Sequence, residues 1–438
     1  MLDVKINALE PRLEQRYQIL VEEHLRTSQS LAPGANPLPS SASSFAATQA
    51  AWRFYHNPSV TLPELAQPLI EEGRRALQEH AQEYGLVIHD ESHLSFNGHA
   101  SKADRIRLSH SRDWGYDLRS TLLVSDRDGA PLAPVCQQVV AAPGVHSTRA
   151  EEPLGRRVYV DELAQEMEHV EQLQLGRPLV HIVDAEGDAA DLHRQWRQYL
   201  HLVRAKWRQR VEHEGQTKLL SQVAQALKAQ GSLQYCREVE FEGRPAHQYV
   251  AETQVTITRY GRQKRKQGRK VKQIYIPGQP VTLRLVVSEV RSAEGQVLAL
   301  WLLLSNVDAK VGAEQLALWY YWRWRIESFF KLLKSAGHQV EHWQQETALA
   351  VAKRLLVASM ACVFVWQLAR EATPEAEELR SLLVRLSGRQ MKRKKPWTVP
   401  ALLAGVWVLL ATLELLEDYD LDRLRELAGK FFPRVEAA

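Results

Sequence analysis

Three acidic side chains in this 438-residue sequence stand where carboxylates could converge. Asp90 ends the short apolar run GLVIHD, Asp184 ends a second run, PLVHIVD, and Glu327 lies in a long amphipathic stretch further along. Short apolar runs bounded by Gly and polar residues predict buried strands, here with a carboxylate at each C-terminal end. If the two strands are neighbours and the helix packs on the same core, the three side chains meet.

Such a cluster would suit phosphodiester chemistry on two divalent metal ions. In-line transfer requires that the attacking and leaving oxygens both be held and neutralised, which paired ions can do. Hard oxygen ligands favour Mg²⁺, with Mn²⁺ as a substitute. The cysteines Cys136, Cys236 and Cys362 are too widely spaced to predict a zinc site or a disulfide framework.

Other carboxylates near the two strands are alternatives to this choice of ligands. They are Asp126, Asp128, Glu186 and Asp188. We expect Asp188 to cap the helix that follows it, since Asp is a favoured capping residue.

Glu327 shares one face of a single helix that the pattern predicts over residues 311–343. The polar side chains of this face are Tyr320, Arg323, Glu327 and Lys334, with Lys331 and Trp324 beside them. At about 100° per residue, the first four fall within roughly 60° of arc. An ordinary solvated face with Arg323–Glu327 and Glu327–Lys331 pairs would show the same spacing.

The elements that must position these residues form a mixed α/β pattern. STLLVSDRDGAPLAPVCQQVVA predicts a hairpin, VDELAQEMEHVEQLQL a helix, and YLHLVRAK a further strand. Strand, hairpin, helix and strand in this order predict a mixed α/β core. Residues 207–299 are β-rich with alternating apolar positions and predict a mainly β insertion.

Helices are predicted at both ends of the chain, with a breaker-rich loop over 31–44. The apolar runs 355–369 and 401–416 are shorter than the ~20 residues of a spanning helix. We therefore expect buried or subunit-interface helices and no membrane partner. The N-terminus lacks the apolar core of a signal peptide, and a reducing, cytoplasmic location is expected.

Positive charge is concentrated in the middle of the chain. Residues 201–300 hold 18 Lys and Arg against 8 Asp and Glu, whereas the whole chain carries only +4. The segment GRQKRKQGRKVK (261–272), predicted as a loop, has seven cations and no anion, and RQMKRKKPW (389–397) is a second basic run. This distribution predicts contact with a polyanion.

The spacing Tyr-x-x-Arg-x-x-x-Glu-x-x-x-x-x-x-Lys from Tyr320 to Lys334 resembles the YREK signature of the insertion-sequence-four family of bacterial DDE transposases. VDAEGD around Asp184 resembles the second-aspartate motif of that family, and EPRLEQR and AAWRFYHNPSV resemble parts of its end-binding domain. The order of parts agrees along nearly the whole chain, although the C-terminal segment shows no clear match.

The resemblance implies a particular division of the α/β fold. An RNase H-like mixed-sheet catalytic core would span residues 71–206 and 300–345, interrupted by the mainly β insertion at 207–299. A helical DNA-end-binding domain at 1–70 and a helical dimerisation domain at 346–438 would flank it.

The implied activity is cut-and-paste DNA transposition. Asp90, Asp184 and Glu327 would be the catalytic metal ligands for two Mg²⁺ ions. A homodimer would act on double-stranded transposon ends and target DNA, and cleavage of the ends would pass through a DNA hairpin intermediate. Two alternative functions are compatible with the same fold. The first is a metal-dependent nuclease, which would not need the end-binding domain that the N-terminal region resembles. The second is a non-catalytic DNA-binding protein descended from a transposase.

The resemblance also implies DNA contacts, namely Tyr320, Arg323, Lys331, Lys334, Arg204, Lys206, Trp301, Trp324, Arg12, Arg16 and Arg53. Arg204 and Lys206 would share one face of a predicted strand because they are two residues apart. Trp301 would stack on a flipped-out base and Trp324 would lie near the vacated position. Among 12 tryptophans, most must instead belong to the core.

Overall fold

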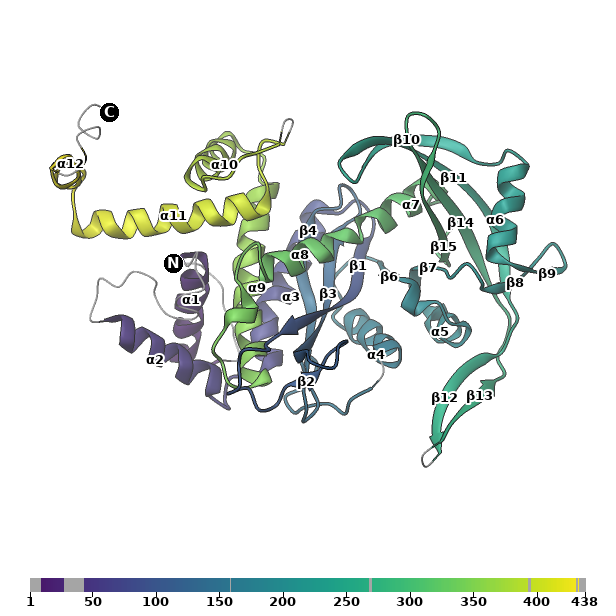
Figure 1. The fold of residues 1–438 in the computed structure, drawn as a ribbon, viewed down its shortest axis with the longest axis horizontal. Helices are drawn as coiled ribbons and strands as arrows, with labels where there is room; N and C mark the ends of the chain where they lie inside the picture. Colours follow the sequence, from purple (N-terminus) through teal and green to yellow (C-terminus); the bar gives the residue numbers. More distant parts are fainter. Residues whose placement is uncertain are drawn as a thin grey trace.

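One mixed β-sheet runs through the middle of the chain and continues into the insertion (Figure 1). The computed structural model describes residues 9–26, 43–157, 159–267, 270–392, 395–430 and 432. In it the strand order is β5-β4-β3-β1-β6-β7-β15-β14-β11-β8-β9, with β2 and β10 paired to β3 and β11. The mixed α/β fold predicted from the sequence is therefore confirmed.

The first half of the sheet is built from the strands β1 Gly85–Ser95, β2 Ile106–Arg107, β3 Trp114–Ser125, β4 Pro131–Val140, β5 Val145–Ser147, β6 Leu179–Val183 and β7 Leu200–Arg204. β1 pairs antiparallel with β3 and parallel with β6, and β6 pairs parallel with β7. The predicted hairpin is β3–β4, whose turn contains Gly129 at φ +69°, a conformation that favours glycine. The predicted helix is α4, Tyr159–Gln172.

Strand β1 is longer than predicted, so Asp90 lies in its middle and not at its C-terminal end. The parallel ladder with β6 stops at Ile88, opposite Ile182, whereas the antiparallel ladder with β3 continues to Ser95. The polar residues after Asp90 remain in the strand because β3 supplies hydrogen bonds that the local pattern does not reveal. Asp90 therefore lies just past the point where β6 leaves β1.

The insertion contributes the strands β8 Arg210–His213, β9 Gln216–Leu219, β10 Gln234–Phe241, β11 Arg244–Ile257, β12 Gly261–Gln267, β13 Lys270–Ile276 and β14 Val281–Arg291, with helix α6 Leu220–Ala229. Strand β15, Val297–Ser305, pairs with both β14 and β7, so the insertion extends the same sheet. An apolar cluster joins the insertion to β15, with Val223 of α6 packed near Leu285 of β14 and Leu304 of β15.

The basic segment 261–272 is not a loop. It forms most of the two-stranded ribbon β12–β13, which projects from the rest of the insertion (Figure 1). Residues 268 and 269 of this segment are outside the described residues. The pairing that makes it a ribbon runs from Gly261 opposite Ile276 to Gln267 opposite Lys270. Charge dominates its composition, which hid the strands from a pattern-based prediction.

Helices occupy both ends of the chain, as predicted. They are α1 Pro11–Arg26, α2 Ser43–His56 and α3 Leu62–His80 at the start, and α9 Ala348–Arg370, α10 Pro374–Leu386, α11 Val399–Asp418 and α12 Leu421–Gly429 at the end. Helix α9 contacts α1, α2, α3 and β4, and apolar residues of all of these share one core. The predicted loop at 31–44 lies almost entirely outside the described residues.

The two apolar helices are longer than the sequence runs suggested. α9 has 23 residues and α11 has 20, so both are long and apolar enough to cross a membrane. In α9, 89% of the most apolar window is buried inside the protein, and this helix includes the buried cations Lys353 and Arg354. α9 is therefore a core helix, which is compatible with a soluble protein. Only 28% of the corresponding window of α11 is buried.

Candidate active site

Asp90 and Asp184 are brought together by the parallel pairing of β1 and β6. Ile88 lies opposite Ile182, and each aspartate follows two residues further along its own chain. Asp184 comes directly after β6 and begins the short 3-10 helix η1, Ala185–Gly187, where its carboxylate accepts a 2.8 Å hydrogen bond from the Glu186 N–H. Asp90 and Asp184 therefore occupy equivalent positions just past the end of the parallel ladder, close enough for Asp184 to act electrostatically on Asp90.

Glu327 joins this pair through a shared guanidinium. Arg323 donates from Nη1 to Asp90 Oδ2 at 2.6 Å and from Nη2 to Glu327 Oε1 at 2.9 Å. Glu327 lies on α8, Trp324–Leu333, and Arg323 is the residue that precedes this helix. The side chain of Arg323 is only 8% exposed, so its charge is held between the two carboxylates and largely away from water.

The electrostatics of Asp90 reflect this crowding. Burial raises the pKa of the Asp90 carboxyl above its ordinary value, Arg323 opposes the rise, and the neighbouring Asp184 adds to it. Burial opposes the charge of Arg323, but Asp90, Tyr320 and Glu327 outweigh it, so the pKa of the guanidinium is raised. The site is an acidic cluster that depends on a cation for its charge balance.

The donor set is suited to a hard divalent ion. Asp90 and Glu327 both lie within hydrogen-bond distance of one cationic group, Asp184 acts electrostatically on Asp90, and all three offer only oxygen. Within the described ranges, no group of three or more His, Cys, Asp or Glu is close enough together to hold a metal ion in the present arrangement. Arg323 provides the positive charge there.

The predicted single helix over 311–343 is wrong in its extent. The structure has α7, Ala313–Trp322, and α8, with a break at Arg323, whose N–H donates to Tyr320 O three residues back. Helix α8 ends at Leu333, with Lys334 as its C-terminal cap. Lys334 has non-helical backbone angles (φ −92°, ψ −118°), and the chain then turns so that Gly337 packs against the Leu332 carbonyl, where a Cβ atom would lie 2.1 Å from that oxygen.

Lys334 nevertheless reaches the strand of Asp90. Its Nζ donates to Ser92 Oγ at 2.9 Å and to the His93 carbonyl, and Glu341 lies 3.8 Å away. Tyr320 is buried, and burial raises the pKa of its phenol although Arg323 and Arg204 lie close enough to oppose the rise. Arg323 and Lys334 therefore contact Asp90 or other residues of β1, Glu327 joins them through Arg323, and Tyr320 lies within electrostatic reach.

A pocket of about 470 Å³ lies beside Asp184, with Ala185 on its wall. Arg204, Lys206 and Trp301 all line it, as does Trp207, which is 46% exposed. Lys206 lies beyond the end of β7 and not within a strand, which corrects the predicted strand pair. The indole of Trp301 is 6.2 Å from the Tyr320 ring, so the pocket adjoins the acidic cluster.

Trp207 is the residue of this pocket that sequence reasoning missed. It directly follows Lys206 in RAKW, and an exposed indole next to two cations is the combination that single-stranded nucleic acid binders use. The sequence RAKWR shows this tryptophan between cations, but the sequence alone does not distinguish an exposed tryptophan from one in the core.

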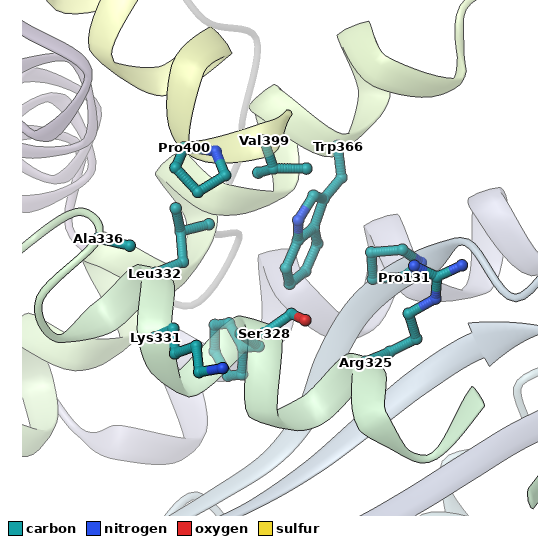
Figure 2. Close-up of a pocket in the computed structure, with 10 residues that line it drawn as sticks. Pro131, Arg325, Ser328, Lys331, Leu332, Ala336, Trp366, Val399 and Pro400 are labelled. Carbon is teal, nitrogen blue, oxygen red and sulfur yellow. The ribbon is translucent and has the colours of Figure 1, made fainter. Parts of the chain in front are cut away.

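The remaining predicted contacts lie elsewhere. Trp324 is 48% exposed, with the Arg323 guanidinium 5.0 Å from the centre of its ring. Lys331 is exposed on α8 and lines a different pocket (Figure 2). Arg12 and Arg16 lie on α1 and Arg53 lies on α2, among the helices at the other end of the molecule from the insertion (Figure 1).

Most of the alternative carboxylates have structural partners. Asp126 accepts hydrogen bonds from the N–H groups of Gln82, Glu83 and Tyr84, and Asp128 accepts one from Ala130 in the β3–β4 turn. These bonds fix turns and leave the two carboxylates committed to backbone. Glu186 is exposed on η1.

Asp188 does not cap the helix that follows, contrary to the prediction. Ala189 is the capping residue of α5, Ala190–Gln195, and it makes no side-chain hydrogen bond. The buried Asp188 carboxylate instead accepts a 2.7 Å bond from the Lys206 N–H, and its other oxygen lies 3.4 Å from His193 Nε2. Asp188 therefore supports the loop that carries Lys206.

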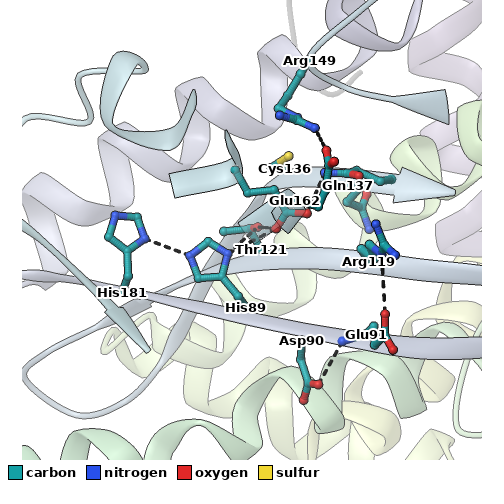
Figure 3. A network of polar contacts seen from close by, with 12 residues as sticks. His89, Asp90, Glu91, Arg119, Thr121, Cys136, Gln137, Arg149, Glu162 and His181 are labelled. Carbon is teal, nitrogen blue, oxygen red and sulfur yellow. Dashed lines mark hydrogen bonds and ion pairs between the residues drawn. The ribbon is translucent and has the colours of Figure 1, made fainter. Parts of the chain in front are cut away.

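A buried polar network lies on the other side of β1 from Asp90 (Figure 3). His89 Nε2 is 2.8 Å from His181 Nδ1, and His89 Nδ1 lies 3.3 Å from Glu166 Oε2 and 3.2 Å from Thr121 Oγ1. His181 continues the chain of contacts to Glu171 at 3.2 Å. These bonds join β1, β3 and β6 to α4 beneath the acidic cluster, and so they fix the strands that hold both aspartates.

A second buried pair, His193 and His201, predicts a pH dependence of stability. Burial lowers the pKa of His201 to about 3, and the neighbouring His193 adds to the effect. An unfolded histidine binds a proton near pH 6.5, so this contribution is present above that value and is lost as pH falls toward 3. We expect His201→Gln to reduce the stability lost between pH 7 and pH 5 by about 2 kcal/mol.

Urea unfolding of the parent and the variant at both pH values measures this difference. The variant must be compared with the parent because another group titrates over the same pH range. Burial raises the pKa of Glu23 to about 7, so Glu23 increases stability as pH falls from 7 to 5, whereas His201 decreases it. His110→Gln, at an exposed position, is the matched control. An unchanged pH dependence in His201→Gln would mean that this imidazole binds protons equally in the folded and the unfolded protein, so that its pKa is not lowered by burial.

No protein-family model matches the chain, and a search of curated proteins found no match either. The functional interpretation therefore depends on the site itself.

Proposed function

We propose that the protein is a cut-and-paste DNA transposase of the insertion-sequence-four type. The observation that carries this proposal is that Asp90 and Glu327, from β1 and from the helix with YREK spacing, share the Arg323 guanidinium, while Asp184 follows the parallel strand next to Asp90. The residues that match the signature are thus neighbours in space as well as correctly spaced in sequence. A solvated surface helix would not require a buried arginine pairing to a strand aspartate.

The order of strands supports an RNase H-like core. Strands β4, β3, β1, β6 and β7 lie side by side, with antiparallel pairing among the first three and parallel pairing among the last three. The insertion then follows β7 and returns through β15, before α7 and α8 bring Glu327 back. This is the order of parts that the resemblance to the family implies.

The chain supplies the parts that such chemistry needs. Asp90, Asp184 and Glu327 would hold two Mg²⁺ ions, or Mn²⁺ in their place, which supply positive charge to the attacking and leaving oxygens of each phosphoryl transfer. Arg323 and Lys334 place two further cations on the same strand, where they would hold DNA phosphates near the cut. The Tyr320 hydroxyl adds a donor at the boundary with the Trp301 pocket.

The reaction would proceed in four transfers at this one site. Water cuts one strand at the transposon end, the freed 3′-OH attacks the opposite strand to give a hairpin, water reopens the hairpin, and the 3′-OH attacks target DNA. Hairpin formation distorts the end, and the Trp301 pocket would receive a flipped-out base, with Arg204 and Lys206 on its phosphates.

Partners follow from the surface of the protein. Arg12 and Arg53 are exposed on the N-terminal helices, where they could contact double-stranded end DNA. Helix α11 exposes a row of apolar side chains, namely Val408, Leu413, Leu415 and Leu416. Two transposon ends must be held together during transposition, and this apolar face would support a homodimer.

Replacing Trp301 with alanine is expected to slow hairpin formation about 10-fold or more while leaving the first nick nearly unchanged. Stacking of one base on an aromatic ring contributes about 1 to 3 kcal/mol, and it is needed only after the base has flipped out. A time course on labelled end DNA, with nicked and hairpin products separated on a denaturing gel, measures both steps. Trp301→Phe should retain much of the activity, and equal slowing of both steps would argue against a stacking role.

The overall proposal is tested with a labelled duplex made from the inverted repeats that flank the coding sequence. Incubation with the protein, Mg²⁺ and a target plasmid should give strand transfer. Cleavage without transfer would favour a metal-dependent nuclease with the same fold. A mobility shift without any cleavage would favour a non-catalytic DNA-binding protein descended from a transposase.

A further inference from the structure

A second pocket, of about 260 Å³, lies on the side of α8 that faces away from Glu327 (Figure 2). At about 100° per residue, Arg325 and Leu332 lie roughly opposite Glu327 on the helix. Trp366 of α9 forms another wall, and the first residue of β4 and the first turn of α11 close the remaining sides. The pocket therefore lies where the helix of the acidic cluster meets the C-terminal helices.

The interior of this pocket is apolar and partly aromatic. The indole of Trp366 extends into it from above, between α8 and the start of α11 (Figure 2). The ring of Phe329 lies 5.5 Å from this indole at an interplanar angle of 63°, and Leu332 adds an aliphatic surface. Because Trp366 and Phe329 are only 3% and 1% exposed, they form the inner wall of the pocket, and the half-buried Val399 and Pro400 provide apolar surface that a ligand could cover.

Two cations stand at the rim of the pocket. The guanidinium of Arg325 lies on one side beside Pro131, and the Lys331 ammonium lies across the pocket from it (Figure 2). Both side chains belong to exposed residues, and neither has an ion-pair partner or hydrogen bond within the described part of the chain. Arg323, by contrast, is already paired to Asp90 and Glu327, so the spare positive charge of this helix faces the second pocket.

We propose that this pocket binds a small amphipathic anion, an organic acid with one or two rings or an equally compact branched apolar body. The acid group would pair with Arg325 and Lys331 while the apolar body lies against Val399, Pro400 and the small exposed part of Trp366. A volume of about 260 Å³ is just below the ~300 to 1,000 Å³ range of sites for drug-sized ligands, which suits a smaller molecule. A bare inorganic anion would leave the apolar wall at Val399 and Pro400 in contact with water, and a neutral hydrocarbon would leave both cations unused.

Calorimetric titration of the full chain with 2-naphthoate tests the proposal, with neutral 2-naphthylmethanol as the matched ligand. The acid is expected to bind at one site, about 10-fold or more tightly than the alcohol, because a charge-assisted contact is lost in the alcohol. Arg325→Gln and Lys331→Gln should each weaken binding of the acid about 3- to 10-fold. Arg112→Gln, at an exposed position on the β2–β3 connection, is the matched control and should leave affinity unchanged.

Filling the pocket provides a second test that does not depend on charge. Ser328 is exposed, and its hydroxyl donates only to the Trp324 carbonyl of its own helix, at 3.3 Å. Ser328→Phe should therefore fold with an unchanged melting temperature and lose binding of both ligands. Absence of binding by the parent at millimolar 2-naphthoate, equal binding of acid and alcohol, or full binding by Ser328→Phe would each overturn the proposal. None of these results depends on DNA cleavage, so they do not decide the catalytic assignment.

Discussion

Replacing Glu327 with glutamine is expected to reduce cutting of end DNA at least about 100-fold while leaving DNA binding nearly unchanged. Glutamine has almost the same shape but carries no negative charge, so it removes one negative charge from the acidic cluster. Arg323 keeps its 2.6 Å pair with Asp90, and the strands and α8 should remain in place. Cutting is measured on a labelled duplex with Mg²⁺, and binding by mobility shift without added metal.

Glu314→Gln is the matched control for this substitution. Glu314 is an exposed glutamate in the first turn of α7, on the same pair of helices but distant in sequence from the break at Arg323. It should cut at the parent rate. If Glu327→Gln also cuts at that rate, Glu327 is not a ligand, and the choice of this helix for the catalytic site is wrong.

The parts of the site that could be predicted from sequence are those that local pattern determines. The apolar runs before Asp90 and Asp184 predicted two buried strands, and both are present as β1 and β6. Apolar periodicity placed Glu327 and Arg323 on one face, and the structure joins them at 2.9 Å. These predictions hold because side chains four residues apart on a helix are neighbours regardless of tertiary structure.

The parts that could not be predicted depend on pairing between distant segments. Asp90 lies mid-strand because β3 continues beside β1 to Ser95, and the basic segment 261–272 forms a ribbon because its two halves pair with each other. The break at Arg323 also has no local signal, since Tyr, Trp and Arg all continue a helix readily. The pairing of Arg323 with Asp90 links residues 233 positions apart.

Replacing Arg323 with methionine is expected to destabilise the metal-free protein by about 2 to 4 kcal/mol. Methionine keeps the apolar stem but removes the charge that balances Asp90 and Glu327. The expected cost is below that of a fully buried pair because the Glu327 side chain is 34% exposed and partly screened by water. Burial already raises the pKa of Asp90 with Arg323 present, so uptake of a proton by this carboxyl would also soften the loss.

Added Mg²⁺ should restore much of this loss, because an ion that binds only the folded protein stabilises it and would replace the missing charge. Urea unfolding of the parent and of Arg323→Met, each with and without Mg²⁺, measures the effect. Arg75→Met is the control, since Arg75 is half exposed and its pairs with Glu72 and Glu79 lie at the surface, where removal should cost less than about 1 kcal/mol. Equal stabilisation of parent and variant by Mg²⁺ would mean that the ions do not replace the positive charge of the Arg323 guanidinium, and would count against binding of Mg²⁺ by the acidic cluster.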